Sequence, residues 1–89
     1  MFKADIENYL TAHGWKKDSY GHFKLTITES KTEKIKEFRC KMQGISIRLE
    51  RKVNQRYPKK THWFKMTSDY YKNIVIDETG KLRINKVRL

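Results

Sequence analysis

Residues 34–53, KIKEFRCKMQGISIRLERKV, contain the pattern that decides the fold. Apolar and charged side chains alternate over residues 38–42, and apolar side chains recur at every second position from Ile45 to Leu49. This period of two is typical of strands that bury one face of a sheet. Gln43-Gly44 lies between the two runs and offers a two-residue turn, because glycine accepts the positive φ that tight hairpins require. We therefore predict a β-hairpin over residues 34–53.

Upstream of the hairpin, the sequence predicts a helix followed by a strand. In residues 2–13 the apolar side chains recur at helical spacing, and Gly14 follows at the position of a left-handed C-terminal cap. In residues 22–29 apolar and polar side chains alternate after a turn at residues 18–21, which indicates a strand with one buried face. Trp15 lies beside the helix end and is expected in the core.

Downstream of the hairpin, the strand patterns are shorter and more interrupted. We expect, in order, a loop at 54–61, a strand at 62–67, a strand at 74–76, a turn at 77–81 and a returning strand at 82–87. Pro58 supports the loop, and Gly80 can take the positive φ of the turn. Residues 68–73 fit neither period.

These elements together predict an α+β fold, in which one N-terminal helix packs on a five- to six-stranded antiparallel meander sheet. Eighty-nine residues can bury one modest core, so residues 1–89 are expected to form a single domain. Lys, Arg, Glu and Thr dominate the strand positions that alternate out of the core. We therefore expect the sheet face opposite the helix to contact solvent.

The composition favours a partner that carries negative charge. The formal net charge is +11, and residues 45–89 hold twelve Lys and Arg against four Asp and Glu. A strongly basic domain is typical of nucleic-acid-binding proteins. The single cysteine, Cys40, excludes an intrachain disulfide and fits a reducing compartment, and no apolar run is long enough to span a membrane. We therefore expect a cytoplasmic protein without a membrane partner.

The densest positive charge lies in residues 48–65, where Glu50 is the only acidic residue. Crowded cations repel one another, and a polyanion relieves that repulsion. The predicted site, which would hold the phosphate backbone of RNA or DNA, comprises Arg48, Arg51, Lys52, Arg56, Tyr57, Lys59, Lys60 and Lys65. Tyr57 is expected to be exposed and to stack on a base, and at least one of Trp63 and Phe64 is expected in the core. Lysines outnumber arginines fifteen to six, which favours backbone contacts over base-specific ones.

A second interpretation is a stoichiometric inhibitor. In size and lysine-rich composition the chain resembles single-domain phage and mobile-element proteins, including anti-CRISPR and other counter-defence proteins. This resemblance implies a host protein or nucleoprotein as the partner, with the basic segment either occupying an acidic, nucleic-acid-facing surface of the target or binding the nucleic acid within it. No motif carries the resemblance, so it names no site residue.

A third interpretation is a small ribonuclease, because His22, His62 and Glu50 are residue types that serve as general acids and bases. Residues 10–23, LTAHGWKKDSYGHF, resemble part of the HicA-type messenger-RNA-cleaving toxins, with Gly14-Trp15 and Gly21-His22 at the matching positions. The spacing is shorter here, the serine that precedes the family's histidine is absent, and strands replace the closing helix. We therefore assign no catalytic residue, and His22 is the residue to test.

The sequence predicts neither a metal site nor a cofactor. It has no cysteine pair and no two histidines at i, i+4, which are common spacings of metal ligands. Its four glycines are scattered singly, so they form no phosphate-binding loop.

Overall fold

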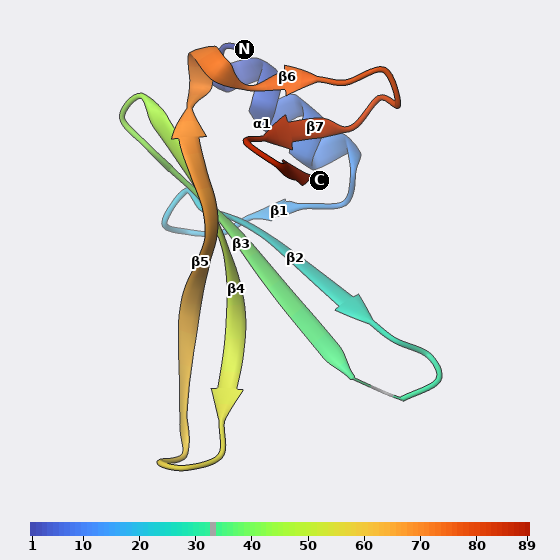
Figure 1. Ribbon diagram of the computed structural model, residues 1–89, viewed down its shortest axis with the longest axis vertical. Coiled ribbons are helices and arrows are strands. Elements are labelled where there is room, and N and C mark those ends of the chain that lie inside the picture. The colour runs from blue at the N-terminus through green and yellow to red at the C-terminus, as the bar shows by residue number, and fades with distance from the viewer. Residues whose placement is uncertain (33) are drawn as a thin grey trace.

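The long strands pair in the order in which they follow one another along the chain (Figure 1). The computed structural model describes residues 1–32 and 34–89. Its elements are α1 (Lys3–Ala12), β1 (Lys16–Lys17), β2 (Phe23–Thr28), β3 (Ile35–Gln43), β4 (Ser46–Gln55), β5 (Lys60–Tyr70), the 3₁₀ turn η1 (Tyr71–Asn73), β6 (Val75–Ile76), β7 (Leu82–Ile84) and β8 (Val87–Arg88). Strands β1 to β5 form an antiparallel meander, which confirms the predicted α+β fold. Strands β6 to β8 form a separate three-stranded sheet instead of extending the meander.

Helix α1 begins and ends one residue inside the predicted range. Ile6, Tyr9 and Leu10 are its buried residues, and their spacing places them on one side of the helix. Gly14 follows with φ of 90°, and the Trp15 N–H donates to the Leu10 carbonyl at 3.0 Å. This left-handed residue ends the helix and turns the chain toward β1.

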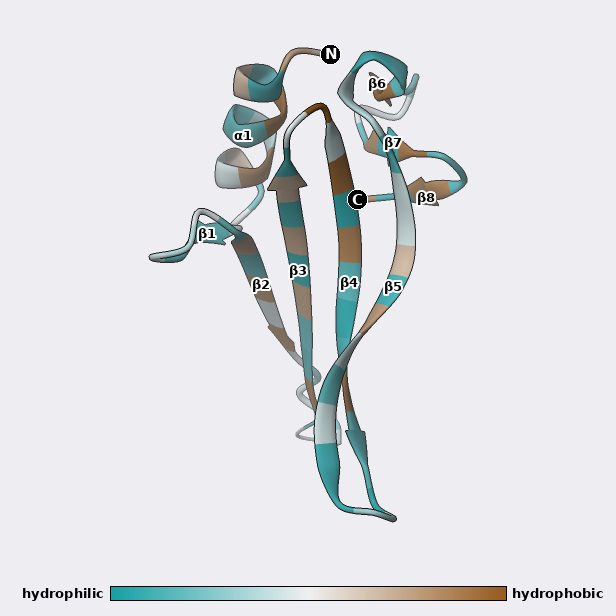
Figure 2. Ribbon diagram, turned by 90° about the vertical axis from the view of Figure 1, so that its left-hand side faces the viewer, coloured by the Kyte–Doolittle hydropathy of each residue, from teal (hydrophilic) through white to brown (hydrophobic). Residues whose placement is uncertain are grey.

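One core lies between α1, the five-stranded sheet and the smaller sheet. Figure 2 shows α1 and β6–β8 gathered at one end of the long strands, while the other end of β2–β5 extends beyond them. The buried apolar residues are Ile6, Tyr9, Leu10, Trp15, Phe23, Cys40, Ile47, Leu49, Tyr71, Ile74, Leu82 and Ile84. Trp15 is therefore in the core, as predicted. The face of the five-stranded sheet that packs against α1, here called the inner face, is thus covered at one end only.

The β3–β4 hairpin has the predicted faces, but its turn lies one residue later. Gln43 pairs with Ser46, so the two turn residues are Gly44 and Ile45 rather than Gln43 and Gly44. Gly44 has φ of 53°, which a type II′ turn requires at its first central position. Ile45 consequently leaves the strand face and is 72% exposed. Relative to the predicted hairpin, the pairing of β3 with β4 is shifted by two residues. Because side chains alternate with a period of two, the same positions remain on the inner face.

The β4–β5 hairpin is longer than the sequence predicts. Asn54 pairs with Thr61 and Gln55 with Lys60, so the loop shortens from residues 54–61 to residues 56–59. The Thr61 hydroxyl also donates to the Asn54 side-chain oxygen at 2.9 Å. These residues lack the apolar alternation by which a strand is recognised, and the backbone ladder of the hairpin holds them in strands. Strand β5 likewise runs to Tyr70, beyond the predicted end at residue 67.

The sheet divides into two arms away from the core. Pairing between β3 and β4 ends at Phe38 and Arg51, whereas β2–β3 and β4–β5 stay paired beyond that point. A register shift at Leu49/Glu50 leaves Met66 without a partner in β4. Such a bulge bends its strand and increases the local twist. The β2–β3 and β4–β5 hairpins therefore diverge, as Figure 1 shows.

Candidate nucleic-acid interface

Cations gather on the face of the five-stranded sheet that points away from α1, here called the outer face. Residues opposite one another on neighbouring strands share a face, and the register places Lys16, Lys24, Arg39, Glu50 and Lys65 in one row across all five strands. Neighbouring strands lie about 4.8 Å apart, so the row is roughly 19 Å long. The outer-face cations are Lys16, Lys24, Arg39, Lys41, Arg48, Lys52 and Lys65.

The carboxylates on this face hold part of its positive charge in place. Glu50 is buried, and Nε and Nη2 of Arg39 both lie 2.9 Å from its Oε1, while Arg48 Nε lies 3.6 Å from Oε2. Glu37 pairs with Lys52 at 2.9 Å. Within the described ranges, no carboxylate lies within salt-bridge distance of Lys16, Lys41 or Lys65. These three ammonium groups are available to an anionic partner.

Trp63 belongs to the outer face rather than to the core. It lies opposite Lys52, and the Arg39 guanidinium is 4.3 Å from the centre of its ring. Phe64 faces the opposite way and is 49% exposed. The expectation that at least one of these two aromatics is buried in the core is therefore wrong, because Trp63 lies on the uncovered outer face and Phe64 lies on an arm that extends beyond α1. The Arg39–Trp63 contact fixes a planar cation on the surface.

The loop at residues 56–59 forms the tip of the β4–β5 arm. Tyr57 is 90% exposed, as predicted, and its carbonyl accepts a hydrogen bond from the Gln55 side chain at 2.7 Å. Arg56, Lys59 and Lys60 are exposed around it, with no salt bridge to any described residue. The tip therefore presents three cations and one aromatic ring beyond the end of the outer face.

The structure divides the eight residues predicted from the sequence among three places. Arg48, Lys52 and Lys65 lie on the outer face, and Arg56, Tyr57, Lys59 and Lys60 lie on or beside the tip. Arg51 pairs with Phe38 and Phe64 and points to the other face of the sheet. Lys16, Lys24, Arg39 and Lys41 are on the outer face but were not predicted from the sequence. The alternation of Lys24, Arg39 and Lys41 with apolar residues on β2 and β3 is a signal that could have identified them, whereas Lys16 lies on a two-residue strand without such a pattern.

The groups considered for ribonuclease chemistry do not form one site. Glu50 is on the outer face, whereas His62 lies opposite Val53 on the inner face, with its ring 4.4 Å from that of Phe64. The backbone N–H of His22 donates to Asp18 Oδ1 at 3.0 Å. Burial opposes ionisation of Asp18, but hydrogen bonds from His22, Tyr20 and Lys24 lower its pKa overall. Asp18 therefore serves as the acceptor that orders the turn before β2.

Residues 1–32 and 34–89 contain neither a cluster of metal ligands nor a helix that could span a membrane. Within these ranges, no three His, Cys, Asp or Glu side chains come together as a metal site would require. No helix in the same ranges has the length and apolar character needed to cross a bilayer.

The chain was compared with protein-family models, curated proteins and solved structures, and none of these comparisons gave a match.

Proposed function

We propose that the protein is a non-enzymatic module that binds the phosphate backbone of RNA or DNA. The observation that carries the proposal is the cross-strand row of cations on the outer face, together with the basic tip beyond it. Lysine ammonium groups attract phosphates as point charges and tolerate any base sequence. Tyr57 adds one exposed ring on which an unpaired base could stack.

The proposal implies a strong dependence on salt. Six cations of the outer face and tip have no carboxylate partner among the described residues: Lys16, Lys41, Lys65, Arg56, Lys59 and Lys60. If each neutralises one phosphate of duplex DNA, the logarithm of the binding constant falls with the logarithm of salt concentration with a slope of about −5. A slope near −1 would contradict six phosphate contacts.

The test reverses the charge at the tip. We expect R56E/K59E/K60E to abolish retention on nucleic acid at about 0.15 M salt without lowering Tm, because all three side chains project into solvent. The matched control is K72E/K81E/K86E, which makes the same change in net charge on exposed lysines outside the outer face and tip. Unchanged retention in the tip variant, or equal losses in both variants, would remove the tip from the interface.

A second candidate function is inhibition of a host protein or nucleoprotein. The observation that favours it is on the inner face of the arms, where α1 does not reach and Ile27, Phe64 and Met66 are each more than 40% exposed. Phe64 and Met66 line one hollow together, and apolar side chains that are exposed side by side mark protein-binding surfaces. Affinity purification from host lysate, repeated after nuclease treatment, separates the two functions. Loss of every partner after nuclease would exclude the inhibitor.

A further inference from the structure

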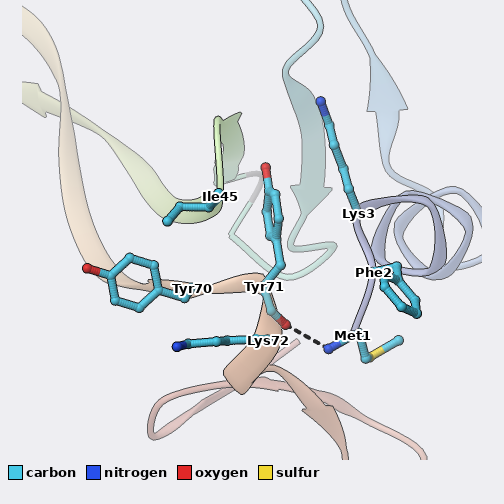
Figure 3. Close-up of a pocket in the computed structure, with 7 residues that line it drawn as sticks. All are labelled: Met1, Phe2, Lys3, Ile45, Tyr70, Tyr71 and Lys72. Carbon is cyan, nitrogen blue, oxygen red and sulfur yellow. Dashed lines mark hydrogen bonds between the residues drawn. The ribbon is translucent and has the colours of Figure 1, made fainter.

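A groove lies at the end of the molecule opposite the 56–59 loop. It has a volume of about 670 Å³ and is lined by Met1, Phe2, Lys3, Ile45, Tyr70, Tyr71 and Lys72. These residues come from the start of α1, the β3–β4 turn and the junction of β5 with η1 (Figure 3). Strand β4 runs for 10 residues between the groove and the tip, so the two lie roughly 30 Å apart.

The walls of the groove expose apolar side chains that nothing in the described chain covers. Phe2 is 82% exposed, and Ile45 and Tyr70 are both at least half exposed. Ile45 is there because the hairpin turn occupies residues 44 and 45, which removes this side chain from the core face of the sheet. Removing such side chains from water is favourable. The groove can therefore bury apolar groups of a ligand.

The charged groups that line the groove are all positive. Lys3 and Lys72 are exposed and form no salt bridge with a described residue, and Lys72 Nζ lies 5.8 Å from the centre of the Tyr70 ring. Figure 3 shows the two lysines on different sides of Tyr71, with Lys3 on α1 and Lys72 on η1. The lining contains no Asp or Glu. A matching ligand therefore carries separated negative charges on either side of an apolar group.

The floor of the groove is held by two hydrogen bonds and contains a buried hydroxyl. The amino group of Met1 donates to the carbonyls of Tyr71 and Ile74 at 2.7 and 3.1 Å, which fixes the start of α1 against η1. The buried Tyr71 hydroxyl has no hydrogen-bond partner among the described residues, and its ring lies between Ile45 and Lys3 in Figure 3. Burial, and then the charge of Glu7, raise the pKa of Tyr71, so the hydroxyl keeps its proton.

We propose that this groove binds an acidic peptide segment of a partner protein. An apolar side chain of the segment rests on Phe2, Ile45 and Tyr70, while carboxylates on either side of it pair with Lys3 and Lys72. A peptide suits this arrangement, because the two lysines come from different elements and a peptide can present a separate carboxylate to each. The groove lies roughly 30 Å from the tip, so the protein would join a nucleic acid at the tip to an acidic protein segment at the groove.

The test uses an array of eight-residue peptides in which one Phe or Leu is flanked by Glu. Matched arrays replace Glu by Gln or by Lys. We expect the Glu array to retain the protein and the Lys array to fail. K3E/K72E should weaken retention by roughly tenfold or more, because two favourable charge contacts become repulsive. K81E/K86E makes the same charge change outside the groove and should have little effect.

Two measurements identify the binding surface: competition between the peptide and other ligands, and NMR chemical shifts of the protein's backbone amides. Shifts confined to the amides around Ile45 and Tyr70 would support the groove. Absence of binding on the Glu array, or equal binding by K3E/K72E, would overturn the proposal. Displacement of the peptide by decanoate at equal concentration, or by an RNA oligonucleotide, would assign the groove to a lipid-like or nucleic-acid ligand instead. The R56E/K59E/K60E variant should still bind the peptide, so failure of the nucleic-acid proposal remains distinguishable.

Discussion

Glu50→Gln tests the charge network beneath the outer face. The Glu50 side chain is 6% exposed, and Arg39, which is 18% exposed, directs two N–H groups to one of its oxygens. Removing one partner from a fully buried pair costs about 3–5 kcal/mol, because the other charge is left without compensation. Glutamine keeps an acceptor for Arg39, and Trp63 still contacts the guanidinium. We therefore expect the free energy of unfolding to fall by about 2 kcal/mol, which lowers Tm by about 8–16 °C.

The matched control is Glu37→Gln on the same face. Glu37 pairs with Lys52 at 2.9 Å, but both side chains are more than one-third exposed. Exposed pairs contribute about 0–1 kcal/mol, so Tm should change by no more than a few degrees. Thermal unfolding followed by circular dichroism measures both variants. Equal melting temperatures for the two would refute the reasoning that burial makes the Arg39–Glu50 pair structurally important.

The same two variants predict a change in nucleic-acid binding with the opposite sign to the change in stability. Each substitution removes one negative charge from the outer face and raises the net charge of the protein by one. Affinity for a phosphate backbone should therefore rise in both variants at low salt, even where Tm falls. Fluorescence anisotropy with a labelled oligonucleotide at a temperature below both transitions measures this effect. Weaker binding by folded Glu37→Gln would contradict an outer-face contact.

Two further predictions concern single groups. Hydrogen bonds from the Thr79 hydroxyl and from nearby backbone amides, together with Arg88, lower the pKa of Asp77 despite its burial. The ionised Asp77 side chain therefore stabilises the fold above the usual carboxyl pKa of about 4. This stabilisation is lost as pH falls through the lower pKa of the folded state. Asp77→Ala should therefore lower Tm at pH 7, and its difference from the unmodified protein should shrink on acidification, whereas a constant difference down to about pH 2 would argue against this role. Burial raises the pKa of the Cys40 thiol to about 12. Iodoacetamide at about pH 8 should therefore modify Cys40 only after unfolding, as measured by mass spectrometry. Rapid labelling of the folded protein would show instead that the thiol is accessible.

Periodicity alone was enough to predict the main elements. The alternation in residues 34–53 indicates which side chains of the hairpin face the core, and Cys40, Ile47 and Leu49 are buried there. The spacing in residues 2–13 likewise predicts α1, and the density of cations in residues 48–65 draws attention to the β4–β5 arm. These features are local, because the side-chain period of a helix or strand follows from its own backbone geometry.

Tertiary structure decided which surfaces remain open. Trp63 and Phe64 are in strand β5 as predicted, but Trp63 lies on the outer face and Phe64 remains 49% exposed on the opposite face, so neither enters the core. Strand pairing added Lys16, Lys24, Arg39 and Lys41 to the outer face and turned Arg51 away from it.

The groove between the start of α1, the β3–β4 turn and η1 also depends on contacts between residues distant in the sequence. It brings together Phe2, Ile45 and Tyr70, which are far apart in the sequence. The sequence of this protein therefore determined the elements and their faces, because these depend on neighbouring residues. Only the folded chain determined which faces are covered and which distant side chains meet, because these depend on register, twist and the docking of elements distant in the sequence.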